Sequence, residues 1–326
     1  MKGKICMSLK KKIITGITLS STSALIIHII NKFIYYSASL DNLLDNPSGT
    51  YYDWKFGKIY YKKTGNGYPL LLIHDLNTFS SGHEWNRVLK QLSKTNTVYR
   101  IDLLGCGRSD KPNLTYTNYL YAQLISDFIK RVIGQKTNVI ATGESGSFVI
   151  SACNNDDSII KKIILINPTD IKELSRIPTK RNKISTNLIS TPIIGTFLYN
   201  ILTRKTMIEN LFEECYFYDK NNIEDELIQT YYEAAHMGDG SPRYLFASLN
   251  GHYTTMNLNH CLKSLTNSIY IIIGKETDEN IEIAGTYQKI LPSIEVDTIE
   301  KTKLLPQLEK PQEFMNQIEI FLDDEC

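Results

Sequence analysis

Short apolar runs alternate along the chain with segments whose apolar residues recur every three or four positions. Residues 69–74 and 269–273 are apolar runs of the kind found in strands buried on both faces. Residues 85–92 and 119–133 show helical spacing instead. This alternation predicts an α/β fold, with a mostly parallel sheet flanked by helices.

The same pattern extends over most of the chain and is interrupted once. Further strands are expected at 54–61 (a strand pair), 97–104, 138–142, 163–166 and 294–299, and further helices at 148–153, 281–291 and 312–322. Residues 171–262 contain helical, aromatic and polar segments without a convincing strand. We therefore expect a core formed by residues 50–170 and 263–326, with a helical cap inserted at 171–262.

The N-terminal segment has the pattern of a membrane anchor. Residues 13–30 carry no formal charge, and eighteen residues at helical rise cover roughly 27 Å, close to the thickness of a bilayer core. Five lysines precede this stretch within the first twelve residues. Residues 1–40 are thus predicted to form a basic tail and a single membrane-spanning helix, with a cytoplasmic N-terminus and the globular part outside. A cleaved signal peptide, which would make the protein secreted, and a helix packed on the globular domain are the alternatives.

Composition excludes several classes of partner and site. Lys and Arg number 36 against 35 Asp and Glu, so no chain-wide field exists to attract nucleic acid. The six cysteines are scattered, without C-x-x-C pairs or histidines at metal-ligand spacing, and we interpret them as free thiols, with disulfides as the alternative. We expect no metal and no cofactor.

One motif carries the candidate chemistry, the sequence Gly143-Glu144-Ser145-Gly146-Ser147 between an expected strand and an expected helix. A nucleophile on a sharp strand-to-helix turn needs small neighbours two positions before and after it, and Gly143 and Ser147 meet that need. The helix N-terminus behind Ser145 offers free N–H groups, that of Gly146 among them, to a developing oxyanion. Ser145 is the predicted nucleophile.

With this motif in place, the chain resembles the α/β-hydrolase superfamily over about residues 55–323. The segments that carry the resemblance are Leu71-Leu72-Ile73-His74-Asp75, the stretch from Asp102 to Pro112 (DLLGCGRSDKP), the Ser145 motif, and Leu305 to Pro311 (LPQLEKP). The second segment is similar to the loop after the fourth strand in dehalogenase-like and epoxide-hydrolase-like members. Those members use Asp as nucleophile, so Ser145 points to the ester, peptide or carbon–carbon bond hydrolases instead.

The resemblance also implies positions for the remaining groups of the site. By position, the Leu76 N–H is the second oxyanion donor, with Gly146 as the first. The acid of a catalytic triad is expected at Asp278, with Glu276 or Asp170 as alternatives. We interpret His74 as a ring that holds loop backbone in place.

The general base is missing from its expected position. The resemblance places a histidine two residues before Pro306, where this chain has Leu304. A leucine can neither accept nor return a proton, and loss of this histidine costs about six orders of magnitude in the best-measured serine hydrolase. A substitute base would have to come from the cap histidines or from Lys303; the cap histidines are His236, His252 and His260.

Three hypotheses follow. The first is a membrane-anchored serine hydrolase that acts on a small ester, thioester or lipid-like acyl substrate through Ser145, with an unconventional base. The second is an inactive pseudohydrolase whose cavity binds a small molecule or a partner. The third, a lyase, would also need an acid–base group near Ser145, so Leu304 counts against it.

Overall fold

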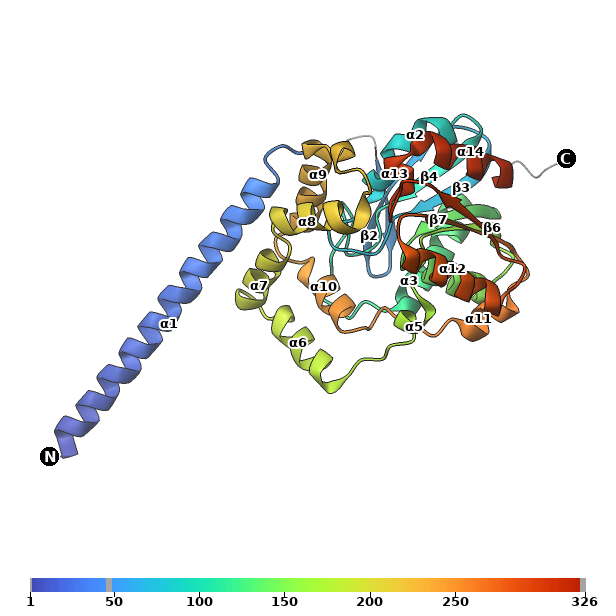
Figure 1. Cartoon of the computed structure of the whole chain (residues 1–326). Coiled ribbons are helices and arrows are strands. Elements are labelled where there is room, and N and C mark those ends of the chain that lie inside the picture. The colour runs from blue at the N-terminus through green and yellow to red at the C-terminus, as the bar shows by residue number, and fades with distance from the viewer. Residues whose placement is uncertain (1, 45–48, 323–326) are drawn as a thin grey trace.

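An eight-stranded sheet forms the centre of the computed structural model, which describes residues 2–44 and 49–322 (Figure 1). The strands are β1 (Thr50–Trp54), β2 (Gly57–Thr64), β3 (Tyr68–Ile73), β4 (Asn96–Ile101), β5 (Thr137–Thr142), β6 (Ile160–Ile166), β7 (Ser268–Gly274) and β8 (Glu295–Ile299). Their order across the sheet is β1-β2-β4-β3-β5-β6-β7-β8. β2 runs antiparallel to both of its neighbours, and the other pairs are parallel, as the alternating pattern predicts.

The direction of winding reverses between β3 and β5. From β3 the chain moves to β4 on one side, and it then returns to place β5 on the other side of β3. In open α/β sheets, ligands bind in the crevice outside the carboxyl ends of the strands at such a reversal. The loops after β3 and β5 therefore begin at the place where a site is expected.

Each strand sends alternate side chains to the two faces of the sheet, and both faces are covered. Leu70 and Leu72 pack with Trp85 and with Phe314 of the last helix on one face. Leu71 on the opposite face joins the larger of the two clusters, which covers the other side of the sheet. Burial on both faces explains why β3 appears in the sequence as a continuous apolar run.

Helices form the two outer layers and the cap. The core helices and short turns are η1 (Gly82–Trp85), α2 (Asn86–Leu92), α3 (Asn118–Phe128), η2 (Ile129–Ile133), α4 (Ser145–Asn155), α12 (Asp278–Ile290), α13 (Pro306–Glu309) and α14 (Pro311–Leu322). Between β6 and β7 the chain is helical: α5 (Ile171–Leu174), α6 (Lys180–Ser190), α7 (Ile194–Leu202), α8 (Lys205–Leu211), η3 (Phe212–Tyr216), η4 (Lys220–Asn222), α9 (Asp225–His236), α10 (Arg243–Asn250) and α11 (Asn259–Ser264). The helical segment expected to interrupt the alternation of strands and helices thus corresponds to the chain between β6 and β7.

A long N-terminal helix, α1 (Lys2–Ala38), extends away from the body, and its C-terminal part packs on the cap (Figure 1). The Tyr35 hydroxyl donates to Asn200 Oδ1 (2.8 Å), and the Asn200 amide donates to Asn31 Oδ1 (3.0 Å). A helix does form where an anchor is expected. However, the described part of the chain contains no helix that is both long and apolar enough to cross a bilayer, so the predicted membrane-spanning helix is not confirmed.

Four cysteines of the described chain are free thiols, as expected; they are Cys106, Cys153, Cys215 and Cys261. Cys326 lies outside the described residues, and the side chain of Cys6 also lies outside the description.

Candidate functional site

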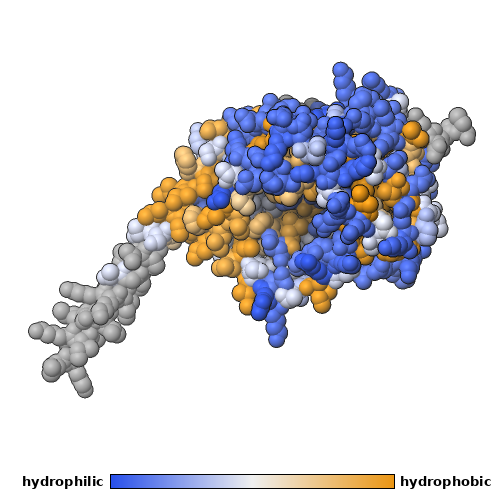
Figure 2. Space-filling model, viewed as in Figure 1, coloured by the Kyte–Doolittle hydropathy of each residue, from blue (hydrophilic) through white to orange (hydrophobic). Residues whose placement is uncertain are grey.

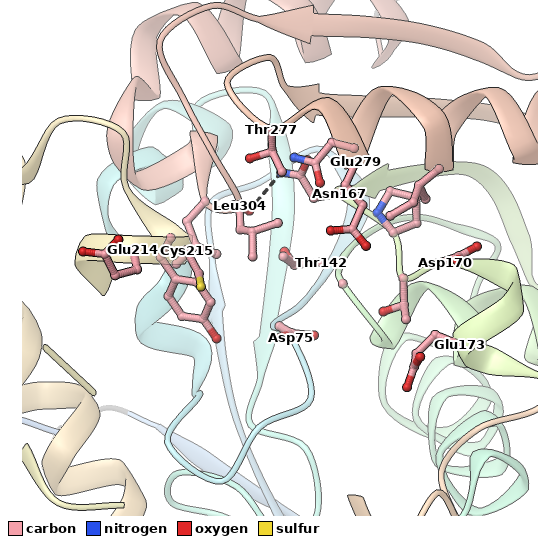
Figure 3. A pocket seen from close by; sticks show the side chains of 17 residues that line it. Asp75, Thr142, Asn167, Asp170, Glu173, Glu214, Cys215, Thr277, Glu279 and Leu304 are labelled. Carbon is pink, nitrogen blue, oxygen red and sulfur yellow. Dashed lines mark hydrogen bonds between the residues drawn. The ribbon is translucent and has the colours of Figure 1, made fainter. Parts of the chain in front are cut away.

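A cavity of about 480 Å³ opens outside the carboxyl ends of the central strands (Figure 3). Asp75 follows β3, Gly143 follows β5, and Asn167 follows β6, so successive strand ends supply its walls. Cys215 and Tyr216 of the cap and Leu304 of the last loop complete the enclosure. The cavity therefore lies at the position that the reversal of the sheet predicts.

Gly143 forms the turn between β5 and α4. β5 ends at Thr142 and α4 begins at Ser145, and the chain reverses through a φ of +57° at Gly143. Side chains other than glycine rarely adopt this left-handed region. A Cβ at Gly143 would also lie 2.1 Å from Asp75 Oδ1, a separation that no real contact shows. Both the backbone and the neighbouring carboxylate therefore require glycine at this turn.

The Asp75 carboxylate occupies the space in front of this turn. Its Oδ1 accepts a hydrogen bond from the Glu144 N–H (3.0 Å), and the Leu76 N–H also bonds to the carboxylate. Burial raises the pKa of Asp75 to about 6, although both N–H bonds act in the opposite direction. Two backbone donors from different loops thus converge on one carboxylate that lines the cavity.

The Ser145 hydroxyl does not reach the cavity. Ser145 is fully buried as the first residue of α4, and its Oγ donates to the His74 carbonyl oxygen (2.7 Å). It is absent from the described cavity lining. The predicted nucleophile Ser145 therefore does not face the described cavity, because the left-handed turn falls two residues earlier and Ser145 already belongs to the helix.

The two expected oxyanion donors differ in outcome. The Gly146 N–H donates to the Gly143 carbonyl oxygen (3.3 Å) and is used within the first turn of the helix. The Leu76 N–H does point to a carboxylate oxygen, that of Asp75. The Glu144 N–H, and not that of Gly146, bonds to the same carboxylate as the Leu76 N–H. The predicted oxyanion donor Gly146 is therefore replaced by Glu144.

His74 holds two loops together, as expected. Its Nδ1–H donates to the Asp75 carbonyl oxygen (2.7 Å), and its Nε2 accepts from the Leu103 N–H (3.0 Å). Burial lowers the pKa of His74, which favours the neutral ring that this pair of bonds requires. Both ring nitrogens are occupied by backbone, so His74 has no role in proton transfer at the cavity.

No imidazole takes the place of the missing base among the described cavity walls. Leu304 itself lines the cavity, and its carbonyl oxygen accepts from the Asn167 amide (2.9 Å). His236 is buried in the cap, where Nδ1 bonds to the Tyr232 carbonyl oxygen (2.8 Å), and burial lowers the pKa of His236 to about 4. Lys303, the other candidate, donates through Nζ to the Glu214 carbonyl oxygen (2.7 Å). His252 and His260 are likewise absent from the described lining.

The three acid candidates lie in different surroundings. Asp278 is exposed at the start of α12 and does not line the described cavity. Glu276 is exposed, and its Oε1 accepts from the Lys301 N–H (2.9 Å). Asp170 does line the cavity, where it caps α5 by accepting from the Lys172 N–H (3.1 Å). Asp170 and Glu276 therefore bond to backbone N–H groups, and the exposed Asp278 lies away from the described cavity lining, so none of the three occupies the place of a triad acid.

Two carboxyl groups beside Asp75, the buried Glu84 and the half-buried Glu144, were not anticipated. Glu84 accepts from the Asp75 N–H (3.2 Å) through Oε2 and from the Gln307 amide (3.0 Å) through Oε1, and burial raises the pKa of Glu84 to about 8. Burial also raises the pKa of Glu144 to about 7. At neutral pH, Glu84 is predominantly protonated. The sequence gives only a weak indication that Glu84 is buried, namely its position directly before the apolar Trp85, which is itself buried.

Asn167 connects three segments that border the cavity. Its amide donates to the carbonyl oxygens of Lys303 (3.1 Å) and Leu304 (2.9 Å), and its Oδ1 accepts from the Gly274 N–H (3.0 Å). It adopts a φ of +42°, which asparagine tolerates better than most side chains. Asn167 thereby fixes the end of β7 and the last loop to the end of β6.

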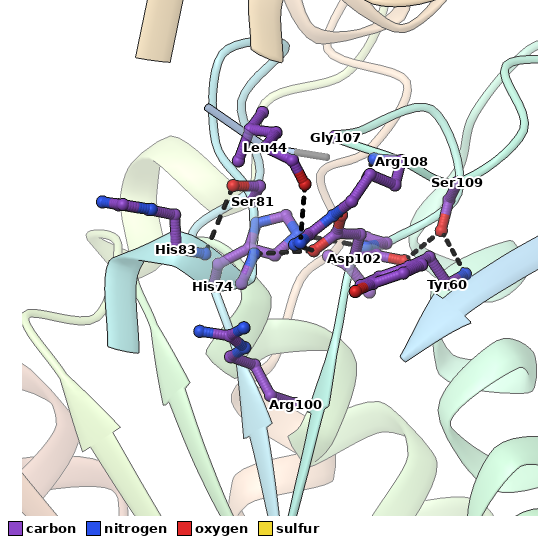
Figure 4. Close-up of polar contacts among 12 residues, drawn as sticks. Leu44, Tyr60, His74, Ser81, His83, Arg100, Asp102, Gly107, Arg108 and Ser109 are labelled. Carbon is purple, nitrogen blue, oxygen red and sulfur yellow. Dashed lines mark hydrogen bonds and ion pairs between the residues drawn. The ribbon is translucent and has the colours of Figure 1, made fainter. Parts of the chain in front are cut away.

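The Asp102 loop, which carries part of the sequence resemblance, is a structural support beside the site (Figure 4). Asp102 accepts from Arg108 Nε (2.7 Å) and Nη2 (2.9 Å) and from the Gly82 N–H (2.7 Å). Burial opposes its charge, but Arg108 outweighs this cost and lowers the pKa of Asp102 to about 2. The Arg108 guanidinium also stacks on the Tyr60 ring, 4.0 Å from its centroid. This ion pair fixes the loop after β4.

The described cavity lining contains acidic residues and no basic one, although Glu173 pairs with Arg176 (2.8 Å) and Glu214 with Lys220 (2.9 Å) outside it. Five acidic residues line the cavity: Asp75, Asp170, Glu173, Glu214 and Glu279. Within residues 2–44 and 49–322, no cluster of three or more His, Cys, Asp or Glu side chains is arranged to hold a metal ion. The described lining itself supplies no basic side chain to an anion.

Comparisons with known proteins agree with this architecture. Residues 70–317 match the alpha/beta hydrolase family. A soluble epoxide hydrolase from Corynebacterium sp. (strain C12) is 26% identical over 109 residues, 33% of this chain and 37% of that protein. The chain thus matches only about a third of the length of this curated relative.

Solved structures share the fold over most of the chain. A carboxylesterase, CesB (YbfK) from Bacillus subtilis, superposes with a TM-score of 0.64 at 16% identity, covering 92% of this chain and 99% of that one. A mutant of CumD, a meta-cleavage product hydrolase from Pseudomonas fluorescens IP01, superposes with a TM-score of 0.66 at 18% identity, covering 82% of this chain and 95% of that one.

Proposed function

Because the chain belongs to the alpha/beta hydrolase family, we propose that it is a pseudohydrolase, a member that keeps the ligand cavity but has lost the nucleophile. In this fold the nucleophile sits on the strained turn between strand and helix, and the N–H of the next residue forms half of the oxyanion hole. Here Gly143 holds that turn, with φ +57°, and Glu144 follows it. A glycine has no side chain with which to attack a substrate.

The single observation that carries this proposal is the position of the Asp75 carboxylate. Its Oδ1 lies within 2.1 Å of the place where a Cβ of residue 143 would be, and it accepts from the Glu144 N–H. The Leu76 N–H, from the loop after β3, bonds to the same carboxylate. The two donors that would stabilise a tetrahedral oxyanion are therefore already satisfied by a group of the protein itself, which also repels developing negative charge.

The rest of the catalytic apparatus supports the same proposal. Leu304 lines the cavity where a base is needed, and Asp278 is exposed at the start of a helix. A hydrolase acting through Ser145 would have to break the bond from Oγ to the His74 carbonyl oxygen and turn a buried side chain out of α4. The retained cavity favours a small organic ligand that is neutral or cationic, because carboxylates line it.

A turnover assay with p-nitrophenyl butyrate and an acyl thioester tests the proposal. We expect no hydrolysis above that of Ser145→Ala or Gly143→Ala protein. Leu304→His should gain nothing, because a restored base has no nucleophile to activate. Hydrolysis by the wild type that disappears in Ser145→Ala, or activity gained by Leu304→His, would contradict the proposal.

The N-terminal helix adds a second part to the proposed function, attachment to a membrane. The lysine-rich start and the charge-free stretch at 13–30 support it, and the same bias favours a cytoplasmic N-terminus with the globular part outside. Flotation of the full chain with phospholipid vesicles tests attachment. Recovery of all protein in the lipid-free fraction would contradict it.

A further inference from the structure

Exposed large apolar side chains gather in two segments of the described chain. Of twenty-one such side chains, seven lie between Leu25 and Leu40 and seven between Ile177 and Met207. The first segment is the end of α1 with the residues after it, and the second covers α6, α7 and the start of α8. Two short stretches thus hold two thirds of the exposed large apolar side chains of the described chain.

These two segments are neighbours in space. The buried residues Asn31, Tyr35 and Ala38 recur every three or four positions and hold α1 against the cap, where the Asn31 amide donates to the Ile193 carbonyl oxygen (3.1 Å). The opposite stripe of α1, which includes Ile26, Ile29, Phe33 and Tyr36, is left exposed. Figure 2 shows the apolar surface of α1 continuing onto the adjoining cap.

The cap contributes outward-facing side chains from two helices. On α6, Ile184 and Leu188 are exposed one helical turn apart, whereas Ile189 is buried. On α7, Ile194 and Ile201 are exposed two turns apart, whereas Tyr199 is buried. Each helix therefore packs with one side and presents apolar residues on the other.

The longer stretches that contain these two segments, residues 1–40 and 174–208, carry charges of one sign. Residues 1–40 contain six lysines and no acidic residue, and residues 174–208 contain six Lys or Arg and no acidic residue. Removing these twelve from 36 leaves 24 basic residues against 35 acidic ones, about −11 for the rest of the chain. Lys32 is paired with Asp239, but the cap stretch 174–208 carries six cations and no acidic residue beside its exposed apolar side chains. Such a surface is complementary to anionic lipid headgroups above an acyl layer.

We infer that α1 and the outer side of α6 and α7 form one lipid-facing surface, which seats the cap on an anionic bilayer. The inference rests on the proposed membrane attachment and extends it from the N-terminal helix to the cap. A second copy of the chain is a poorer occupant, since it would bring the six cations of its own residues 174–208 against the same basic stretch. The acidic remainder of the molecule then faces away from the lipid.

Vesicle titration of the full chain tests this inference, with phosphatidylcholine vesicles and vesicles containing about 30% phosphatidylglycerol. We expect the anionic vesicles to bind at least about fivefold more tightly, and about 0.5 M salt to weaken that binding. Ile184→Asp with Leu188→Asp should raise the lipid concentration for half-binding about tenfold. The matched control is Ile320→Asp on α14, a side chain as exposed as Ile184 (75% and 70%) and outside both segments; it should bind as the wild type does.

The outcomes separate the two proposals. Absence of wild-type binding would overturn both the membrane attachment and this inference. Wild-type binding that Ile184→Asp with Leu188→Asp leaves unchanged would overturn the inference alone and leave attachment to α1. A protein that forms dimers in the absence of lipid, and whose dimers the cap variant dissociates, would identify a second copy as the occupant and also overturn it.

Discussion

In the proposed pseudohydrolase, Gly143 occupies the turn on which the fold carries its nucleophile. Gly143 has a left-handed backbone, and the Asp75 carboxylate lies 2.1 Å from where a Cβ would be. Backbone conformation and steric clash thus each exclude a side chain at this position. The Asp75 carboxylate accepts hydrogen bonds from the Glu144 N–H, which belongs to the same turn as Gly143, and from the Leu76 N–H. The two residues are therefore energetically coupled.

We expect Gly143→Ala to destabilise the protein by about 2–4 kcal/mol, the sum of backbone strain and overpacking. In an Asp75→Ala background the same substitution should cost at least about 1 kcal/mol less, because the clash is gone. Urea unfolding of the four proteins measures this coupling. Additive losses would show that Asp75 does not occupy the space in front of residue 143.

The buried carboxyl groups predict a pH dependence of stability. The pKa of Glu84 is raised by burial to about 8 in the folded protein, against 4.5 for an exposed glutamate. The folded state therefore binds more protons than the unfolded state between these values, and this contribution to stability is full below about pH 4.5 and is lost as the pH rises through 8. Burial raises the pKa values of Asp75 and Glu144 as well, so both act in the same direction.

Glu84→Gln removes the largest of these contributions and keeps a side chain of similar shape. Between about pH 5.5 and 8 we expect the melting temperature of the wild type to fall by several degrees, roughly 2–4 °C for each kcal/mol lost, and that of Glu84→Gln to fall less. Thermal melts at both pH values measure the difference. Glu282→Gln, at an exposed position of α12, is the control and should follow the wild type. Equal slopes for all three proteins would contradict the raised pKa.

At the site, the sequence pattern identified the loop between β5 and α4, but it centred the motif on Ser145, whereas the left-handed turn falls at Gly143. Small residues two positions before and after a central residue occur around Ser145, as Gly143 and Ser147, and also around Gly143, as Ala141 and Ser145. The choice of register depended on finding a serine, and backbone dihedral angles are not visible in a sequence. The absence of a base at Leu304 and the supporting role of His74 could be predicted, because each follows from residue type and loop position.

Among the elements, strands and helices of the core could be predicted because their apolar periods differ so clearly. Residues 69–74 and 138–142 were expected as buried strands, and they are β3 and β5 at the centre of the sheet. Contacts between distant segments could not be predicted in this way. Asn167, which bonds to residues more than one hundred positions away, shows no pattern in the sequence that reveals its partners.

Asn167→Ala should loosen three elements together. The substitution removes three hydrogen bonds that join the ends of β6 and β7 to the last loop, and it places alanine at a φ of +42°. We expect a loss of about 2–4 kcal/mol in the free energy of unfolding. Urea denaturation measures it, with exposed Asn316→Ala as the matched control. A loss below about 1 kcal/mol would mean that these bonds do not hold the cavity wall.

The docking of α1 on the cap offers a test on two adjacent tyrosines. Tyr35 is 8% exposed and donates to Asn200, whereas Tyr36 is 67% exposed. Tyr35→Ala should speed hydrogen exchange across residues 31–38 and lower the melting temperature, because it removes buried ring area and a buried hydrogen bond. Tyr36→Ala should leave both near wild-type values. Equal effects would contradict the packing of α1 on the cap.

At the scale of the whole molecule, two stretches of the chain carry only basic charges although the net charge is only +1. Twelve of the 36 basic residues lie at 1–40 and 174–208, two stretches without an acidic residue, and five carboxylates line the cavity. The arrangement pairs a surface suited to anionic lipid with a cavity suited to neutral or cationic ligands. Neither feature requires a reactive serine.

The central claim, that no nucleophile faces the cavity, is tested most directly by exposing the folded protein to a fluorophosphonate and weighing the intact chain, beside an active serine hydrolase treated in the same way. We predict an unchanged mass for this protein and a full adduct on the active enzyme. A stoichiometric adduct that maps to Ser145 and is lost in Ser145→Ala would contradict the claim.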